Sequence, residues 1–168
     1  DYSADSAAYS FALDAARNAD PKNGWCVTPQ EENELHGKIL RMDSAQSIGY
    51  VLADGDIEGV FKNRARNNTR LAFDGVMPQA ISEGGIKLDC YGEGLVYTYE
   101  RYGFIPVARI EFNPDYANPG WDESKGRPYI YMMINNGDSA ETVVSKIGQY
   151  RHFTVEQLQS LPTYGKDG

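Results

Sequence analysis

The sequence has few of the residues that build disulfide-stapled or metal-bound folds. Its 168 residues include two cysteines, Cys26 and Cys90, and two histidines, His36 and His152. Two cysteines are too few for a disulfide framework, and their spacing does not match that of a metal site. We therefore expect both thiols to be reduced, as in a cytoplasmic protein, and we expect no metal centre.

Long apolar runs are also missing from the chain. No stretch approaches the roughly 20 consecutive apolar residues of a membrane helix, and no secretory signal opens the sequence. We therefore expect a cytoplasmic protein without membrane association. The first residue is Asp1 rather than methionine, from which we expect a processed product or a part of a larger polypeptide.

The chain has fewer positive than negative side chains. The chain has 16 lysines and arginines against 24 aspartates and glutamates, and its formal net charge is −8. Such a surface repels phosphate backbones, so we do not expect nucleic acid as a partner, whereas amines are weakly attracted. The length and the 41% share of hydrophobic residues suit one domain with a single core.

The first half of the chain reads as a helix followed by closely spaced strands. A helical period predicts a helix over residues 6–18. The pair Asp54-Gly55 is typical of a tight hairpin turn between two antiparallel strands. Short apolar runs predict four strands, the last three of which form an antiparallel meander: residues 24–29, 37–43, 47–54 and 56–63.

The period changes after the meander. An apolar stripe from Phe73 to Ile81 predicts a helix, with Asn68 or Thr69 as its cap and Pro78 as an internal kink. This order of elements predicts a mixed sheet with helices on its faces, in the α/β (α+β) class. The remaining elements are expected as strands at 86–91, 104–112 and 129–134, a short helix at 95–102, and two helices after residue 138.

The hexapeptide Tyr-Glu-Arg-Tyr-Gly-Phe at residues 99–104 follows a β-meander, a basic loop, a helix and a strand. This order and the Tyr-Glu-x-x-Gly-Phe signature resemble the GCN5-related N-acetyltransferase (GNAT) fold. More narrowly, GGIKLDCYGEGLVYTYERYGFIPVARIEFNPDYANPGW and GRPYIYMMINNGDS are similar to a GNAT-like domain of phage-, plasmid- and mobile-element-encoded bacterial proteins.

The resemblance covers a core of about residues 24–139. It implies a single GNAT-like domain over residues 1–168, with the N-terminal helix and the C-terminal helical tail added to that core. It also implies a mostly antiparallel central sheet with one splayed parallel pair of strands and helices on both faces.

The function that the resemblance implies is direct transfer of an acetyl group from acetyl-coenzyme A to a small-molecule amine or a protein amino group. In the family the tyrosine of the signature commonly protonates the departing thiolate, which makes Tyr99 the general acid. Related enzymes often keep a carboxylate base on the last meander strand, where this chain has Glu58. The alternatives are that Tyr99 is a core residue and that Glu58 is an exposed glutamate opposite Lys62 or Arg64.

The resemblance also implies a cofactor site. The pantetheine arm would pair with the backbone of the last meander strand, including Val60 and Phe61, where one amide can polarise the thioester carbonyl. The phosphates would meet the basic loop that follows, through Arg64, Arg66, Asn68, Thr69 and Arg70.

The phosphate loop is where the chain departs from the family. The usual Arg/Gln-x-x-Gly-x-Gly/Ala corresponds here to NRARNNTRLAFDG, which has no glycine before Gly75. The arginines would then pair with surface acids, and the chain would be a non-catalytic GNAT-like interaction module of a phage or mobile-element protein. Both functions are kept as hypotheses.

Cys90 offers a third chemistry, because a cysteine near the site could form an acyl intermediate. A nucleophilic cysteine needs a base beside it. No motif places His36 or His152 near Cys90, so the sequence favours a buried structural thiol.

Overall fold

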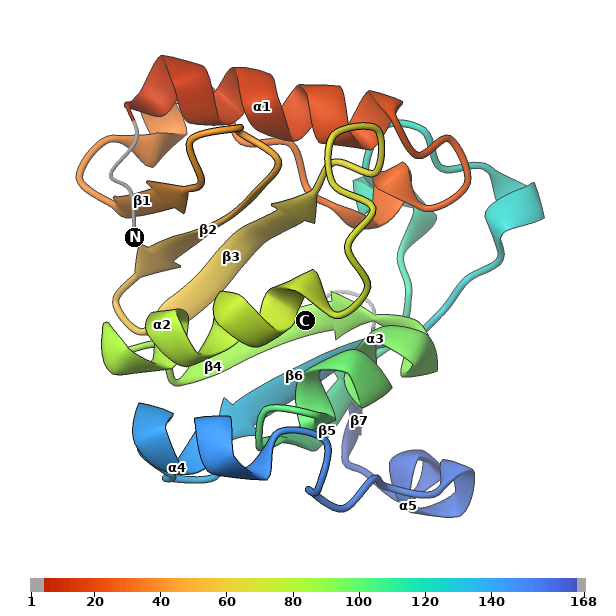
Figure 1. The fold of residues 1–168 in the computed structure, drawn as a ribbon. Helices are drawn as coiled ribbons and strands as arrows, with labels where there is room; N and C mark the ends of the chain where they lie inside the picture. The colour runs from red at the N-terminus through yellow and green to blue at the C-terminus, as the bar shows by residue number, and fades with distance from the viewer. Residues whose placement is uncertain (1–4, 166–168) are drawn as a thin grey trace. The chain divides into compact units, whose positions relative to one another are not determined.

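A computed structural model describes residues 5–165 (Figure 1). The described residues form two compact units. The first unit runs up to Ala72 and also contains Asn118–Lys125, and the second contains Phe73–Ala117 and the described residues from Gly126 onward. Both units combine helices with strands, which confirms the predicted mixed α/β (α+β) class. Within residues 5–165 no helix is long and apolar enough to cross a membrane.

The first unit is a helix packed on a three-stranded meander. The helix has the predicted bounds, and the Asp5 side chain caps it by accepting a hydrogen bond from the Ala8 N–H. Asp54 and Gly55 both have positive φ, 52° and 83°, as a type I′ hairpin turn requires. The elements are α1 (Ser6–Asn18), β1 (Ile39–Met42), β2 (Ile48–Ala53) and β3 (Asp56–Lys62), with β1–β2 and β2–β3 antiparallel (Figure 1).

The core of this unit lies where α1 covers the meander. Tyr9 and Leu13 of α1 are fully buried with Val51 and Phe61 of the strands. The rings of Tyr9 and Phe61 meet edge to face, with centroids 5.4 Å apart. Gly49 lies beneath this pair, and its lack of a side chain lets both rings approach the strand.

The prediction of a strand at residues 24–29 is wrong. Gly24–Cys26 forms a 3₁₀ turn, η1, in which the Gly24 N–H donates to the Asp20 carbonyl. The Arg17 guanidinium donates a hydrogen bond to the Val27 carbonyl at 3.0 Å. Local and side-chain partners therefore replace the ladder that a strand would need. A second turn, η2 (Glu32–Leu35), follows with a capping box.

The sheet of the second unit contains four strands. β6 lies between β4 and β5 and is antiparallel to both, and the two-residue β7 pairs with β5 in parallel. α3 begins directly after β4 and packs against β4, β5 and β6. The strands are β4 (Lys87–Tyr91), β5 (Phe104–Ile110), β6 (Ile130–Asn135) and β7 (Thr163–Tyr164), and the helices are α2 (Met77–Ser82), α3 (Gly92–Glu100), α4 (Ala140–Lys146) and α5 (Val155–Gln159).

The helix after the basic loop begins later than predicted, and Asn68 and Thr69 do not cap it. α2 begins at Met77, after the 3₁₀ turn η3 (Ala72–Gly75). Pro78 lies in the first turn of α2, where its missing N–H costs nothing, so it does not kink the helix. Upstream, the Asn67 side chain accepts from the Thr69 N–H, and this turn competes with a helix start.

Two predictions about the whole chain stay predictions. One is the splayed parallel pair of strands, and the other is that the chain forms a single domain. The two helices predicted after residue 138 are confirmed as α4 and α5, and Thr154 and Gln157 form a capping box at the start of α5.

Gly49→Ala tests the packing of α1 on the meander. A Cβ at this position would lie 2.5 Å from the Arg41 carbonyl oxygen and 3.0 Å from the rings of Phe61 and Tyr9. We expect the free energy of unfolding to fall by about 2 kcal/mol, as for other overpacked cores. Urea denaturation measures it.

Gly94→Ala is the matched control. No atom lies within 4 Å of a Cβ built at Gly94, which is in α3. Alanine is the better helix former, so this variant should be as stable as the parent or more stable. Equal losses in the two variants would contradict the packing account.

Candidate active site

Tyr99 lies on the buried side of α3. The helix follows β4 without a loop and ends at Glu100. Shortly after it, Gly103 has a φ of +86°, the left-handed conformation that often follows the end of a helix. Val96 and Tyr99 face the interior, and Tyr99 is 8% exposed. The ring of Tyr99 therefore belongs to the core, as one of the two interpretations of the sequence predicted.

The Tyr99 hydroxyl differs from those of two other buried tyrosines, Tyr9 of the first unit and Tyr102 of the second. Tyr9 donates to the Gly59 carbonyl and Tyr102 to the Asp74 carboxylate, each at 2.7 Å. The Tyr99 hydroxyl makes no hydrogen bond to any residue between 5 and 165, and no fully buried side-chain oxygen in that range lacks a partner. The phenol oxygen therefore keeps some contact with solvent.

The environment of Tyr99 keeps its proton in place. Burial, and secondarily the neighbouring Cys90, raises the pKa of the Tyr99 phenol well above its usual value. The group is therefore neutral over the physiological range. A neutral phenol can donate a hydrogen bond but cannot accept a proton as a base.

Cys90 is a buried thiol at the end of β4. It is 5% exposed, and its Sγ lies 3.8 Å from the Met133 Sδ. Burial, with smaller contributions from the charges of Asp89 and Glu100, raises the pKa of the Cys90 thiol to about 12. The nucleophile is the thiolate, so this environment disfavours an acyl-cysteine.

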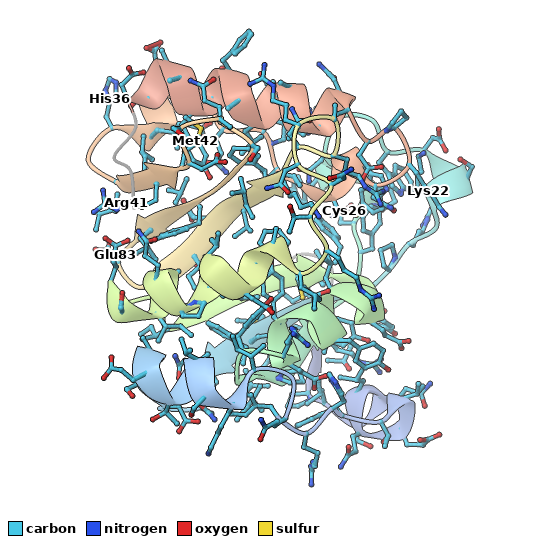
Figure 2. The ribbon with its side chains drawn as sticks, in the orientation of Figure 1. Lys22, Cys26, His36, Arg41, Met42 and Glu83 are labelled. Atoms are coloured by element: carbon cyan, nitrogen blue, oxygen red, sulfur yellow. The ribbon has the colours of Figure 1, made fainter. Side chains whose placement is uncertain are left out.

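Cys26 is no better placed for nucleophilic chemistry. Burial and the nearby Asp20 raise the pKa of the Cys26 thiol to about 11. Figure 2 shows His36 at the opposite end of the first unit, so it cannot act as a base for Cys26. Both cysteines are free thiols.

Glu58 pairs with Lys38, and not with Lys62 or Arg64 as the sequence suggested. Its carboxylate accepts from the Lys38 Nζ at 2.7 Å, and both side chains are a little under a third exposed. Lys62 instead donates to the Thr69 carbonyl at 2.7 Å. Solvent can therefore reach the Glu58 carboxylate, but the carboxylate already has Lys38 as a partner.

Next to Glu58, β3 carries a β-bulge. Gly49 of β2 pairs with Phe61, and Val51 pairs with Glu58, so β3 has one more residue than β2 across this step. Gly59, with φ +55°, lies in the bulge, and its carbonyl accepts from Tyr9. A bulge leaves an extra residue outside the ladder, within the segment that contains Val60.

The basic loop is held by contacts inside the first unit. Arg64 lies 3.5 Å from the Asp20 carboxylate, and Arg66 donates to the Ala45 carbonyl at 3.3 Å. Asn68, Thr69 and Arg70 are exposed. The loop therefore brings the predicted phosphate-binding residues to the surface, but two of its arginines already have partners.

A network that the sequence did not predict ties α3 to η3. The Asp74 carboxylate accepts from Arg101 at 2.9 and 3.0 Å and from the Tyr102 hydroxyl at 2.7 Å. The hydrogen bond from Arg101 holds the pKa of Asp74 below its usual value, and burial raises that of Tyr102. The partners are 27 and 28 residues apart, and no periodic pattern signals such a pair.

Glu100 forms a second unpredicted contact. It is 1% exposed, and its two oxygens bind the His152 Nδ1 and the Phe153 N–H, each at 2.9 Å. A buried carboxylate satisfied on both oxygens fixes the tail against α3. His152 is therefore used in packing, and its other face meets the Tyr97 ring.

A pocket of about 340 Å³ lies in the first unit, around the end of α1 and the loop at residues 118–125. Arg17, Asp20 and Trp25 are among the residues that line it, and none of the predicted site residues does. Within residues 5–165 no cluster of three or more histidine, cysteine, aspartate or glutamate side chains could hold a metal ion.

Comparison with known proteins adds no relative. No family model matches the chain, and no curated protein or solved structure is significantly similar to it. The GNAT relationship, the acetyltransferase activity and acetyl-coenzyme A binding therefore stay predictions.

Asp74→Asn tests the network at the end of α3. The variant loses the ion pair with Arg101, and because the side chains are partly exposed we expect a loss of about 1 kcal/mol at pH 7. The folded-state pKa of Asp74 is lowered, so its contribution is present above about pH 4 and is lost as the pH falls through that pKa.

Urea denaturation between pH 7 and pH 3 measures the difference between the parent and Asp74→Asn, which should shrink at low pH. Tyr102→Phe is the control, since it removes one hydrogen bond and leaves the charge pair. A difference that is constant with pH would show that the Asp74 charge does not contribute.

Thiol labelling tests the two cysteines. With pKa values of about 11 and about 12, both thiols should react with iodoacetamide at pH 7.5 at least about 100-fold more slowly in the folded protein than in urea. Mass spectrometry over time gives the rates. Rapid labelling of Cys90 in the folded protein would reopen the acyl-cysteine route.

Proposed function

We propose that this protein is an acetyl-coenzyme A-dependent N-acetyltransferase in which Tyr99 is the general acid. The observation that carries the proposal is the Tyr99 hydroxyl, whose ring is packed in the core while its oxygen has no hydrogen-bond partner between residues 5 and 165. A phenol whose ring is packed in the core and whose oxygen has only limited contact with solvent loses part of the hydrogen bonding that it has in water. Such a group is better explained by a ligand that completes its hydrogen bond than by packing alone.

The bulge in β3 supports the same proposal. An extra residue beside Gly59 takes backbone groups out of the β2–β3 ladder. Backbone groups outside a ladder can bind an extended amide chain such as pantetheine, and one N–H can polarise the thioester oxygen. The unpaired segment contains Val60, and Phe61, which pairs with Gly49, follows it directly; the family resemblance implies both residues.

In the proposed reaction the acetyl group passes directly from the thioester to the amine. A neutral amine attacks the thioester carbonyl carbon, a C–N bond forms, and the C–S bond breaks to release the coenzyme A thiolate. The amine proton passes through water to Glu58, which is partly exposed. Tyr99 supplies a hydrogen bond to the thiolate and then its proton. The proton taken up by Glu58 is released to solvent, and Tyr99 regains a proton from solvent, so that both groups are restored.

The relative acidities define what Tyr99 contributes. A thiol has a pKa of about 8.5 and a free phenol about 10, and burial raises that of Tyr99 further. Full transfer of the proton is therefore uphill until the product leaves. Most of the acceleration must come from the hydrogen bond to the developing thiolate, and the proton follows at release.

The acceptor in this proposal is a cationic amine, on a small molecule or a protein. The net charge of −8 attracts such a group. The attacking nitrogen must first lose a proton, because a lysine-like amine has a pKa of about 10.4. Turnover should therefore rise with pH between 6 and 9.

Tyr99→Phe tests the proposal. It removes only an oxygen that no residue between 5 and 165 binds, so the variant should keep the parent's stability. Turnover should fall at least tenfold, with little change in the affinity for acetyl-coenzyme A, since the lost hydrogen bond forms with the departing thiolate. Calorimetry gives the affinity, and acetylation of a polyamine or a lysine-rich peptide gives the rate.

The matched control is Tyr102→Phe, a neighbouring tyrosine whose hydroxyl is bound to Asp74. This change should lower stability slightly and leave turnover within about twofold. Equal turnover in the parent and Tyr99→Phe would contradict the role of the phenol.

A non-catalytic interaction module is the second candidate. It is favoured by the basic loop, in which Lys62, Arg64 and Arg66 already bind groups of the first unit and no glycine opens the backbone to phosphate. Calorimetry with coenzyme A separates the two candidates. Saturable binding supports the enzyme, and no heat at millimolar cofactor supports the module.

A further inference from the structure

One face of the second unit's sheet is covered, and the other is apolar and exposed. α3 packs against β4, β5 and β6, and the side chains directed to the covered face, such as Leu88, Tyr131 and Met133, are at most 2% exposed. The alternate residues on β5 and β6 are large, apolar and 36–45% exposed: Ile105, Val107, Met132 and Ile134.

The strand register arranges these side chains in two rows of three. In the first row, Ile134 of β6 lies between Lys87 of β4 and Ile105 of β5. In the second row, Met132 lies between Asp89 of β4 and the bulge of β5 that contains Val107. We name these six residues the outer face.

The charges of the outer face lie at one side. Lys87 and Asp89 are both exposed, two residues apart on β4, with the apolar residues beside them. Each row therefore begins with one charge, and the two charges are opposite. Although the Asp89 side chain is exposed, its surroundings partly desolvate the carboxyl and raise its pKa, and the charge of Lys87 offsets this only in part.

We propose that the outer face binds a second copy of this chain. The two-fold axis lies between the sheets, perpendicular to the strands and midway between the rows. This operation exchanges the two rows and keeps the order of the strands. It therefore brings Lys87 against Asp89 of the partner subunit, and Asp89 against Lys87 of the partner subunit.

The same operation matches the apolar side chains. Ile134 meets Met132 of the partner subunit, and Ile105 meets Val107 of the partner subunit. A two-fold interface must be complementary to itself, and a row of one charge sign would repel its own copy. The opposite signs of Lys87 and Asp89 satisfy this condition, which identifies another copy as the occupant. Sheets that pack face to face bury such alternating apolar residues.

Charge reversal tests the arrangement. Lys87→Asp places like charges at both contacts with the second copy, and Asp89→Lys does the same with the opposite sign. Each variant alone should weaken the dimer at least tenfold in sedimentation velocity at low salt. Mixing the two variants should restore it, because the mixed dimer has two attractive pairs.

Two controls separate the interface from folding. Circular dichroism should be unchanged in each charge variant, because both side chains are exposed. Val107→Glu should abolish the dimer in the parent and in the mixture, since it introduces a charge into the apolar part of the outer face. Its matched control is Val144→Glu, at an exposed valine of α4, which should leave the dimer intact.

The proposal is overturned if the parent is monomeric up to about 1 mM. It is also overturned if a dimer forms but neither charge variant weakens it, or if the mixture stays monomeric. Acetyltransferase activity has no part in these measurements, so their outcome is independent of the proposed function.

Discussion

The orientation of α3 is the constraint on which the candidate site depends. Glu100, one residue after Tyr99, is buried and binds the His152 ring and the Phe153 N–H, and Arg101 and Tyr102 both bind Asp74. Three successive residues thus fix the rotation of the helix at its end. Because side chains project from fixed positions on a helix, these contacts also fix where the Tyr99 phenol points. None of these side-chain contacts is made by the Tyr99 phenol itself, and their effect is to hold its hydroxyl in one place.

In the first unit, a buried tyrosine of α1 supports the bulge of β3. Tyr9 packs its ring on Phe61 and donates its hydroxyl to the Gly59 carbonyl in the bulge of β3. The helix α1 therefore supports the irregular part of the strand from beneath, and Gly59 supplies the positive φ that the bulge needs. Strain in a strand persists only where neighbouring contacts maintain it. The bulge is thus a built feature of the sheet, and the proposed function gives it a role in binding the cofactor's amide chain.

Periodic parts of the fold could be predicted from the sequence, and parts held by long-range polar contacts could not. The helix α1, the Asp54-Gly55 turn and the strand β5 each follow from local rules and are confirmed. Residues 24–29 have the composition of a strand, but Arg17 and Asp20 hold them in a turn. α2 begins late because asparagine side chains form turns upstream. At the site, Tyr99 and Glu58 are conspicuous in sequence, whereas Asp74, His152 and Lys38 are found only through the fold, since nothing local marks their partners.

The central claim is that the unbonded Tyr99 hydroxyl is reserved for the sulfur of a thioester. A crystal structure with bound acetyl-coenzyme A tests this claim most directly. The account predicts that the cofactor sulfur lies within hydrogen-bonding distance of the Tyr99 oxygen, with the pantetheine arm along β3. Bound cofactor whose sulfur contacts other residues, with the Tyr99 hydroxyl still unbonded, would contradict it.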